Sequence, residues 1–165
     1  MTKQSFLIRL NKESKIEIVE PSEEMKESYL HKAEDCLKSA KVLLENKLYE
    51  NSVINAYYTM YNSLTALLFK SGIKCENHSA SIILLEILFE EKELSKVIQE
   101  AKEERLDKQY YIDDQKNINR NEKSTKELII KAEDFFIKIR LVINKVSVQD
   151  IKELRSKLNN LFNKI

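Results

Sequence analysis

The sequence contains very little of what turn-rich and nucleotide-binding folds require. Its 165 residues include one glycine and one proline. Many β-rich folds need Gly, Asn-Gly or Pro at their turns, and α/β nucleotide-binding folds need a glycine-rich phosphate loop. Both classes are therefore disfavoured, and we expect an almost entirely helical chain. A chain of this length can bury a single core, so no cofactor or metal is needed to hold it together.

The sequence also lacks an excess of charge of either sign. Lys and Arg number 28 against 27 Asp and Glu, a formal charge of +1. No strong overall field therefore directs the chain to nucleic acid or membrane, and any polyanion site must be local. Cys36 and Cys75 lie far apart, which favours reduced thiols over a disulfide. No apolar run approaches the ~20 residues of a membrane span, so we expect a soluble, cytoplasmic protein.

Apolar residues recur at helical spacing along most of the chain. Three long patterns, at residues 22–46, 49–70 and about 77–89, predict the first three helices, and a fourth begins near Glu93. The polar stretch 112–124 predicts a loop. Ser-x-x-Glu and Ser-x-x-Asp capping boxes predict the start of two more helices, at Ser124 and Ser147. The expected fold is an all-α, up-and-down bundle of five to six helices.

Residues 6–20 show a different pattern. Phe6, Ile8 and Leu10 alternate with period two, and a second apolar group at 16–19 follows a polar stretch. This alternation predicts two short strands around a turn. We therefore divide the chain into an extended or hairpin-like segment, 1–21, and one helical domain, 22–165.

The second predicted helix is apolar on nearly all sides, which places it in the middle of a bundle or against a second subunit. Tyr57, Tyr58 and Tyr61 lie on it. Tyrosine suits contacts with one apolar and one wet side, so we assign these residues to the core and to a homodimer interface. Stacking against nucleic-acid bases is the alternative.

Arg105 is the most informative single position. It follows Ala101 by four residues, which places its guanidinium on the apolar face of the fourth helix. A permanent charge there needs a partner or a polyanionic ligand. Alternatively, the side chain extends outward or pairs with an acidic residue, the candidates being Glu104, Asp107 and Asp134. Tyr110 and Tyr111 follow, either sealing the end of the bundle or lining a groove beside Arg105.

Three interpretations of His78 are open. It lies three residues after Cys75, but two ligands alone make a poor zinc site. It can instead start or pack a helix, or approach Arg105 in space and supply an acid or base. The other histidine, His31, is interpreted as a surface residue. A scatter of basic residues interrupted by acids indicates a solvated surface: Lys102, Lys108, Lys116, Arg120 and Lys123.

From Tyr29 to about Ile143 the chain resembles the HEPN superfamily, close to its small stand-alone prokaryotic group. The matching features are spread along the sequence. They are Tyr29-Leu30-His31-Lys32-Ala33-Glu34, Leu48-Tyr49-Glu50-Asn51-Ser52, Ala56-Tyr57-Tyr58-Thr59-Met60-Tyr61, the stretch 64–69, His78 after Gly72, and Arg105 with Tyr110 five residues on. The order and spacing of these pieces carry the resemblance.

The resemblance implies a homodimer and one of two activities. Many HEPN proteins resemble metal-independent ribonucleases with an Arg-x4–6-His motif, in which His moves a proton and Arg stabilises the phosphorane. Tyr110 stands where that His is expected, and a phenol is a poor base at pH 7. Stand-alone members resemble partners of a minimal nucleotidyltransferase in a toxin–antitoxin pair. In some related pairs a Tyr is modified with AMP, and here the analogous acceptor is Tyr110 or Tyr111.

Two functional hypotheses follow, with a third class also allowed. The first is a homodimeric HEPN binding module that engages a nucleotidyltransferase and contacts RNA or a nucleotide through Arg105, Lys108 and Tyr111. The second is a metal-independent RNA endonuclease, a HEPN ribonuclease toxin, that uses Arg105 with Tyr110 or with a spatially recruited His78. A small helical protein that binds free nucleotides near Arg105 is the third.

Overall fold

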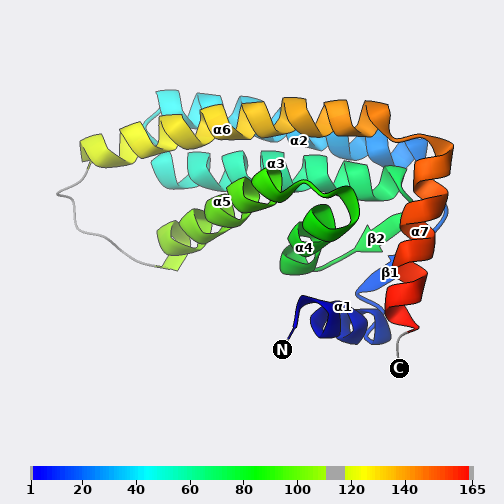
Figure 1. The fold of residues 1–165 in the computed structure, drawn as a ribbon. Helices are drawn as coiled ribbons and strands as arrows, with labels where there is room; N and C mark the ends of the chain where they lie inside the picture. Colours follow the sequence, from blue (N-terminus) through cyan, green and yellow to red (C-terminus); the bar gives the residue numbers. More distant parts are fainter. Residues whose placement is uncertain (1, 111–117, 164–165) are drawn as a thin grey trace.

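The computed structural model describes residues 2–110 and 118–163, with side chains described outside 107–120. Within these residues the chain forms seven helices and two short strands (Figure 1). In chain order they are α1 (Lys3–Lys12), β1 (Ile16–Ile18), α2 (Glu23–Glu45), α3 (Tyr49–Lys70), β2 (Ile73–Cys75), α4 (His78–Phe89), α5 (Lys92–Tyr110), α6 (Ile118–Lys145) and α7 (Val148–Phe162). The all-α prediction is confirmed.

Helix α3 lies at the centre of the bundle, as its apolar sequence predicts. It packs against α2, α4, α5 and α6, and twelve of its residues are buried. In Figure 1, α2 and α6 run side by side along one side of α3, and α4 and α5 lie on the other. The core therefore forms around α3, and side chains from α3 reach both α4 and α5.

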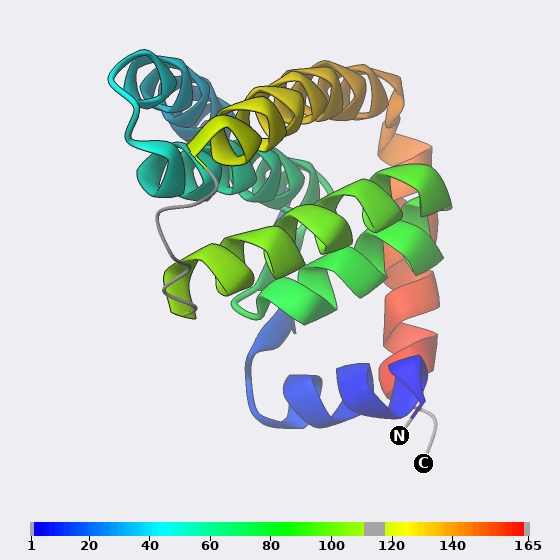
Figure 2. The ribbon, with the colours of Figure 1, turned by 90° about the vertical axis from the view of Figure 1, so that its left-hand side faces the viewer.

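Helices α4 and α5 form a pair across a tight turn, visible as neighbouring green ribbons in Figure 2. The turn is made at Glu90, which adopts the left-handed conformation with φ of 60°. Asn77 caps α4, its side chain accepting a hydrogen bond from the Ala80 amide. This turn brings the beginning of α4 beside the later part of α5.

The predicted strand at residues 6–10 is wrong, because these residues lie in helix α1. Thr2 caps the helix by accepting a hydrogen bond from the Ser5 amide. Leu7 and Leu10, spaced by three, are buried, and α1 packs against α4 and α7. Over so short a segment, the apolar residues Phe6, Ile8 and Leu10 fit the two-residue period of a strand and also one face of a helix. Burial of that helical face selects the helix.

The second predicted strand exists, but its partner is elsewhere. β1 pairs antiparallel with β2, with Ile16 opposite Cys75 and Ile18 opposite Ile73. Gly72 precedes β2 with φ of +73°, and a Cβ there would lie 2.6 Å from the Val19 carbonyl oxygen. Glycine is therefore needed here, just after the end of α3, both for its backbone angle and for the close approach of the segment after β1.

The polar segment 112–124 is only partly tested. Residues 111–117 lie outside the described residues, and 118–124 are helical, so α6 begins before the predicted cap. Ser124 lies inside α6 and donates to the Asn121 carbonyl oxygen. The second predicted capping box is confirmed, because Ser147 and Asp150 bond each other's backbone amides at the start of α7. No described helix is long and apolar enough to cross a bilayer.

Candidate functional site

Arg105 lies on the inward face of α5, as its spacing predicts. Its guanidinium carbon is 4.8 Å from the centroid of the Tyr57 ring and 5.7 Å from that of Tyr58. The Nη1 atom donates a hydrogen bond of 3.3 Å to the Tyr58 hydroxyl. The Nε atom is buried and has no hydrogen-bond partner among the described residues. A cation–π contact thus holds the guanidinium while part of its hydrogen-bonding capacity stays unused.

His78 contacts the same tyrosines. Its Nδ1 is 2.6 Å from the Tyr57 hydroxyl, and its ring stacks on Tyr61 with centroids 3.7 Å apart. We call Arg105, His78, Tyr57, Tyr58 and Tyr61 the Arg105 cluster. The tyrosines come from α3, the histidine from the first position of α4 and the arginine from α5. Three elements that are separate in sequence therefore converge at this point.

The electrostatics keep His78 neutral. Burial lowers the pKa of His78 to about 4, and the positive charges of Arg105 and Lys102 act in the same direction. Burial also raises the pKa of Tyr57 well above its ordinary value. At neutral pH the hydrogen bond therefore joins a protonated phenol to an uncharged imidazole, and one ring nitrogen of His78 remains to act as a donor or acceptor.

The structure selects among the interpretations of Arg105 and His78. Asp134 pairs with Lys138 at 2.7 Å rather than with Arg105. His78 begins a helix, and its ring contacts a tyrosine that also contacts Arg105. The helix-start interpretation and the approach to Arg105 therefore hold together, and the role of His78 as an acid or base stays a prediction. The Cys75 thiol donates to the Asn77 carbonyl oxygen at 3.4 Å, and burial raises the pKa of that thiol.

The tyrosines predicted at a dimer interface differ in exposure. Tyr57 is fully buried within the chain, so it is a core residue and offers no surface to a second copy. Tyr58 and Tyr61 are half-buried, and their assignment to an interface stays a prediction. Of the other predicted site residues, Tyr111 lies outside the described residues, as do the side chains of Lys108 and Tyr110.

Sequence reasoning misses Lys102 and Ser79. The sequence pattern assigns Lys102 to a solvated basic surface, but its side chain is half-buried and donates to the Ser79 hydroxyl at 2.5 Å. Its position three residues before Arg105 places both cations on one side of α5. This three-residue spacing is the feature of the sequence from which the placement of Lys102 beside Arg105 could have been predicted. Ser79 also fits the pattern of a helix cap, but the residue that caps α4 is Asn77.

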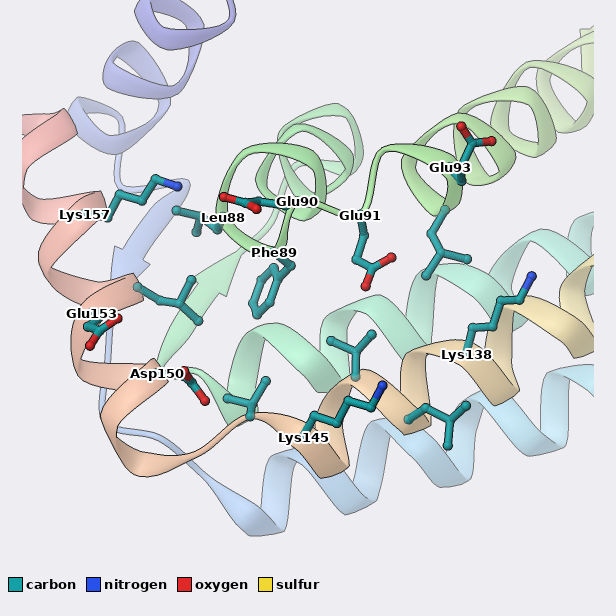
Figure 3. A pocket seen from close by; sticks show the side chains of 15 residues that line it. Leu88, Phe89, Glu90, Glu91, Glu93, Lys138, Lys145, Asp150, Glu153 and Lys157 are labelled. Carbon is teal, nitrogen blue, oxygen red and sulfur yellow. The ribbon is translucent and has the colours of Figure 1, made fainter.

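A groove lies away from the Arg105 cluster. This groove, with a volume of about 710 Å³, lies between the α4–α5 turn, the end of α6 and the first part of α7, and Figure 3 shows its lining. We call it the α6–α7 groove. Its apolar side chains are Leu88, Phe89, Leu94, Leu141, Val142, Val146 and Leu154, and its charged ones are Glu90, Glu91, Glu93, Lys138, Lys145, Asp150, Glu153 and Lys157.

The charged side chains of this groove are of both signs, and several have structural partners. Lys138 pairs with Asp134, Lys157 donates to the Ile87 carbonyl oxygen at 2.9 Å, and Asp150 caps α7. None of the residues lining it belongs to the Arg105 cluster. The groove is therefore separate from the Arg105 cluster, and it gathers no excess of cations.

The fold and site together define a class: a helical bundle whose central helix presents tyrosines to an arginine and a histidine on two neighbouring helices. Comparison with known families agrees, because the HEPN domain family matches residues 26–142. The chain belongs to the HEPN domain family. This confirms the resemblance on which the sequence-based expectations rest.

Two named relatives are similar to this chain. One is "Putative toxin MJ0605" of Methanocaldococcus jannaschii, 39% identical over 57 residues, which is 34% of this chain and 42% of that protein. The match thus covers less than half of that relative. The other is a "UPF0332 protein" of Thermotoga maritima, 29% identical over 126 residues, covering 73% of this chain and 92% of the relative.

Proposed function

We propose that the protein is a binding module that holds a phosphate group of RNA or of a nucleotide at the Arg105 cluster. The observation that carries this proposal is the state of Arg105. Its Nε is buried and unpaired among the described residues, and no described carboxylate forms an ion pair with it. A guanidinium binds phosphate through paired N–H donors, and a buried donor without a partner is costly. Arg105 as a whole is half-buried, so a phosphate can approach its Nη donors and supply the opposite charge that the described residues do not.

The aromatic residues suit the rest of such a ligand. Tyr58 is half-buried and touches the guanidinium, so its exposed part can support a base beside the phosphate. Stacking of a base on an aromatic ring contributes about 1–3 kcal/mol and tolerates every base. We therefore expect affinity for RNA with little sequence preference.

Binding of a labelled single-stranded RNA, followed by fluorescence anisotropy, tests the proposal. We expect Arg105→Ala to weaken binding about tenfold or more, since hydrogen bonds to charged groups contribute about 1.5–3 kcal/mol. Arg105→Lys keeps the charge but loses the planar fork, so its binding is intermediate. Arg140→Ala is the matched control, because Arg140 lies over Phe136 on the exposed side of α6. Equal binding by all four proteins would contradict the proposal.

We extend the proposal to assembly. A HEPN module of this kind is a homodimer that works in the cytoplasm with a minimal nucleotidyltransferase, as one half of a toxin–antitoxin-like pair. The name of one relative, a toxin, supports the direction of this proposal.

Sedimentation of the isolated chain tests the dimer. Mass spectrometry after incubation with ATP and a minimal nucleotidyltransferase tests AMP transfer to Tyr110 or Tyr111, with Tyr110→Phe and Tyr111→Phe to locate it.

A second function is favoured by a specific observation, the placement of His78. The residue contacts Tyr57, which Arg105 also contacts, and this shared contact supports a role for its imidazole in place of the one missing from the motif position. In this alternative the protein is a metal-independent endoribonuclease in which neutral His78 takes the proton of the 2′-hydroxyl and Arg105 stabilises the phosphorane. RNA cleavage that persists in EDTA and is lost in both His78→Gln and Arg105→Ala would establish it. Binding without cleavage supports the module.

A further inference from the structure

A second cationic group faces the same part of the site. Lys102 lies one helical turn before Arg105 on α5, and its Nζ donates to the Ser79 hydroxyl. Ser79 directly follows His78 in α4. Two neighbouring residues of α4 therefore lie beside the two cations of α5. His78 contacts the tyrosines that hold Arg105, and Ser79 accepts the hydrogen bond from Lys102.

Two positive charges lie close together in this region, and an opposing influence on Lys102 comes from its neighbour Glu103, whose charge raises the Lys102 pKa. No described carboxylate forms an ion pair with Lys102, whereas other half-buried lysines have them: Lys26 pairs with Glu23 and Glu27. Burial and the charge of Arg105 both lower the pKa of Lys102, and those two cations together lower that of His78. Holding like charges together in a half-buried place costs stability, and a bound polyanion offsets it.

We propose that Lys102 and Ser79 form a second phosphate subsite beside Arg105, so that the protein binds ligands carrying two successive phosphates. The proposal rests on the proposed function, which places the first phosphate at Arg105. The shared chemistry is a pair of linked phosphates, found in neighbouring nucleotides of an RNA strand and in the diphosphate of a free nucleotide. The experiment below distinguishes these two sources.

The roles of the two residues follow from their chemistry. Lys102 supplies a point charge with three donors, of which Ser79 uses one. The Ser79 hydroxyl accepts from Lys102, which leaves its own proton to donate to a phosphate oxygen. Arg105 supplies a planar fork for the first phosphate. A ligand with one phosphate therefore fills the Arg105 position alone, and the second phosphate gains from Lys102 and Ser79.

Calorimetric titration with AMP and ADP tests the proposal for free nucleotides. For wild-type protein we expect ADP to bind about tenfold tighter than AMP, since an added charge-assisted hydrogen bond is worth about that factor. In Lys102→Ala we expect the ratio of ADP affinity to AMP affinity to fall close to one, while the AMP affinity stays within about twofold of the wild-type value. Lys96→Ala is the matched control, because Lys96 lies on the exposed side of α5 with 72% of its side chain accessible. It keeps the wild-type ratio.

The second arm uses a labelled single-stranded RNA. Removing one cation that neutralises a phosphate makes the slope of log K against log salt concentration shallower by about 0.7 for single strands. We expect this change in Lys102→Ala and the wild-type slope in Lys96→Ala. A changed slope with an unchanged ADP-to-AMP ratio identifies RNA as the source of the two phosphates. A changed ratio with an unchanged slope identifies a free nucleotide.

Folding does not obscure this test. Removing Lys102 relieves repulsion with Arg105, so Lys102→Ala should melt no earlier than Lys96→Ala. If Lys102→Ala alters neither the ratio nor the slope while Arg105→Ala still weakens binding, the second subsite is wrong and the proposed function stands. If the wild-type protein binds none of AMP, ADP and RNA, the proposed function and this inference both fail.

Discussion

The Arg105 cluster and the α6–α7 groove differ in how their charges are balanced. The groove has a volume of about 710 Å³, and its charges are of both signs, several of them paired or capping. The cation of the Arg105 cluster, Arg105 itself, packs on Tyr57 and Tyr58 and has no ion pair with a described carboxylate. Under the proposed function, the volume of a hollow does not locate the ligand. We place the ligand where a cation packs on aromatic rings without a described ion-pair partner, because such a charge is costly unless a ligand binds it.

The largest expected effect is the difference between two charge reversals, one in the Arg105 cluster and one in the groove. Arg105→Glu should weaken RNA binding by about 100-fold or more, since it removes the donors and repels phosphate. Lys145→Glu makes the same kind of reversal in the groove, where Lys145 is exposed, and should change affinity by less than about threefold because no phosphate binds there. Anisotropy titrations at one fixed salt concentration measure both. A larger decrease for Lys145→Glu would reverse the comparison.

The next effect concerns the hydrogen bond inside the cluster. Tyr57→Phe removes the phenol that bonds His78 Nδ1 and leaves a buried ring nitrogen unsatisfied, so we expect a decrease of about 1–3 kcal/mol in the free energy of unfolding. Tyr29→Phe is the same chemical change at a ring that stacks on Phe69. Its hydroxyl makes no hydrogen bond with a described residue, so the change should stay within about 0.5 kcal/mol. Urea titration compares the two variants, and equal decreases would count against the proposed hydrogen bond.

A smaller effect is the contribution of His78 to pH dependence. Its pKa is about 4 in the folded protein and 6.5 as a free side chain. Between these values the unfolded chain binds a proton that the folded chain does not, so stability falls as pH drops from about 6.5 to 4. Allowing for solvent screening of a half-buried ring, we expect about 1–2 kcal/mol. Urea titrations over this range should show a flatter curve for His78→Gln.

His31→Gln controls for the removal of a histidine, because His31 is exposed. Several carboxyl groups, including those of Glu23 and Asp150, have lowered pKa values, so their protonation in acid also destabilises the fold. Their contribution is common to all three proteins. Only the difference between wild type and His78→Gln therefore reports on His78. Parallel curves for these two proteins would show that the ring is not held neutral.

The smallest effect is expected in the groove itself. Leu141 is 52% exposed, so Leu141→Ser should change the free energy of unfolding by less than about 0.5 kcal/mol. It should leave RNA affinity unchanged, since Leu141 does not touch the cluster. Thermal unfolding and the anisotropy assay measure these quantities. Abolished RNA binding in this variant would move the ligand from the cluster to the groove.

Most of the fold could be predicted from sequence, and the exceptions have physical causes. α3 begins and ends where its pattern predicts, because a long apolar repeat and a single glycine leave little ambiguity. α1 could not be predicted, because three alternating apolar residues fit either period and only burial of Leu7 and Leu10 decides. The start of α6 escapes prediction because its first turns are polar, so helical periodicity gives no signal there.

The site is predictable in part. Arg105 can be placed inward from its spacing after Ala101, since both belong to one helix. The approach of His78 to the same tyrosines is one of three open interpretations at the level of sequence, because it depends on how the α4–α5 turn folds. Lys102 and Ser79 escape prediction for the same reason: their hydrogen bond joins two helices, 23 residues apart in the chain. Contacts between elements are the part that local patterns cannot supply.

Side-chain NMR during a titration with AMP tests the central claim most directly. The account predicts saturable shifts at the Arg105 guanidinium, the His78 imidazole and the Tyr58 ring, with the methyl groups of Leu141 and Leu154 unchanged. Shifts confined to the groove methyl groups, with Arg105 and His78 unmoved at saturation, would contradict it.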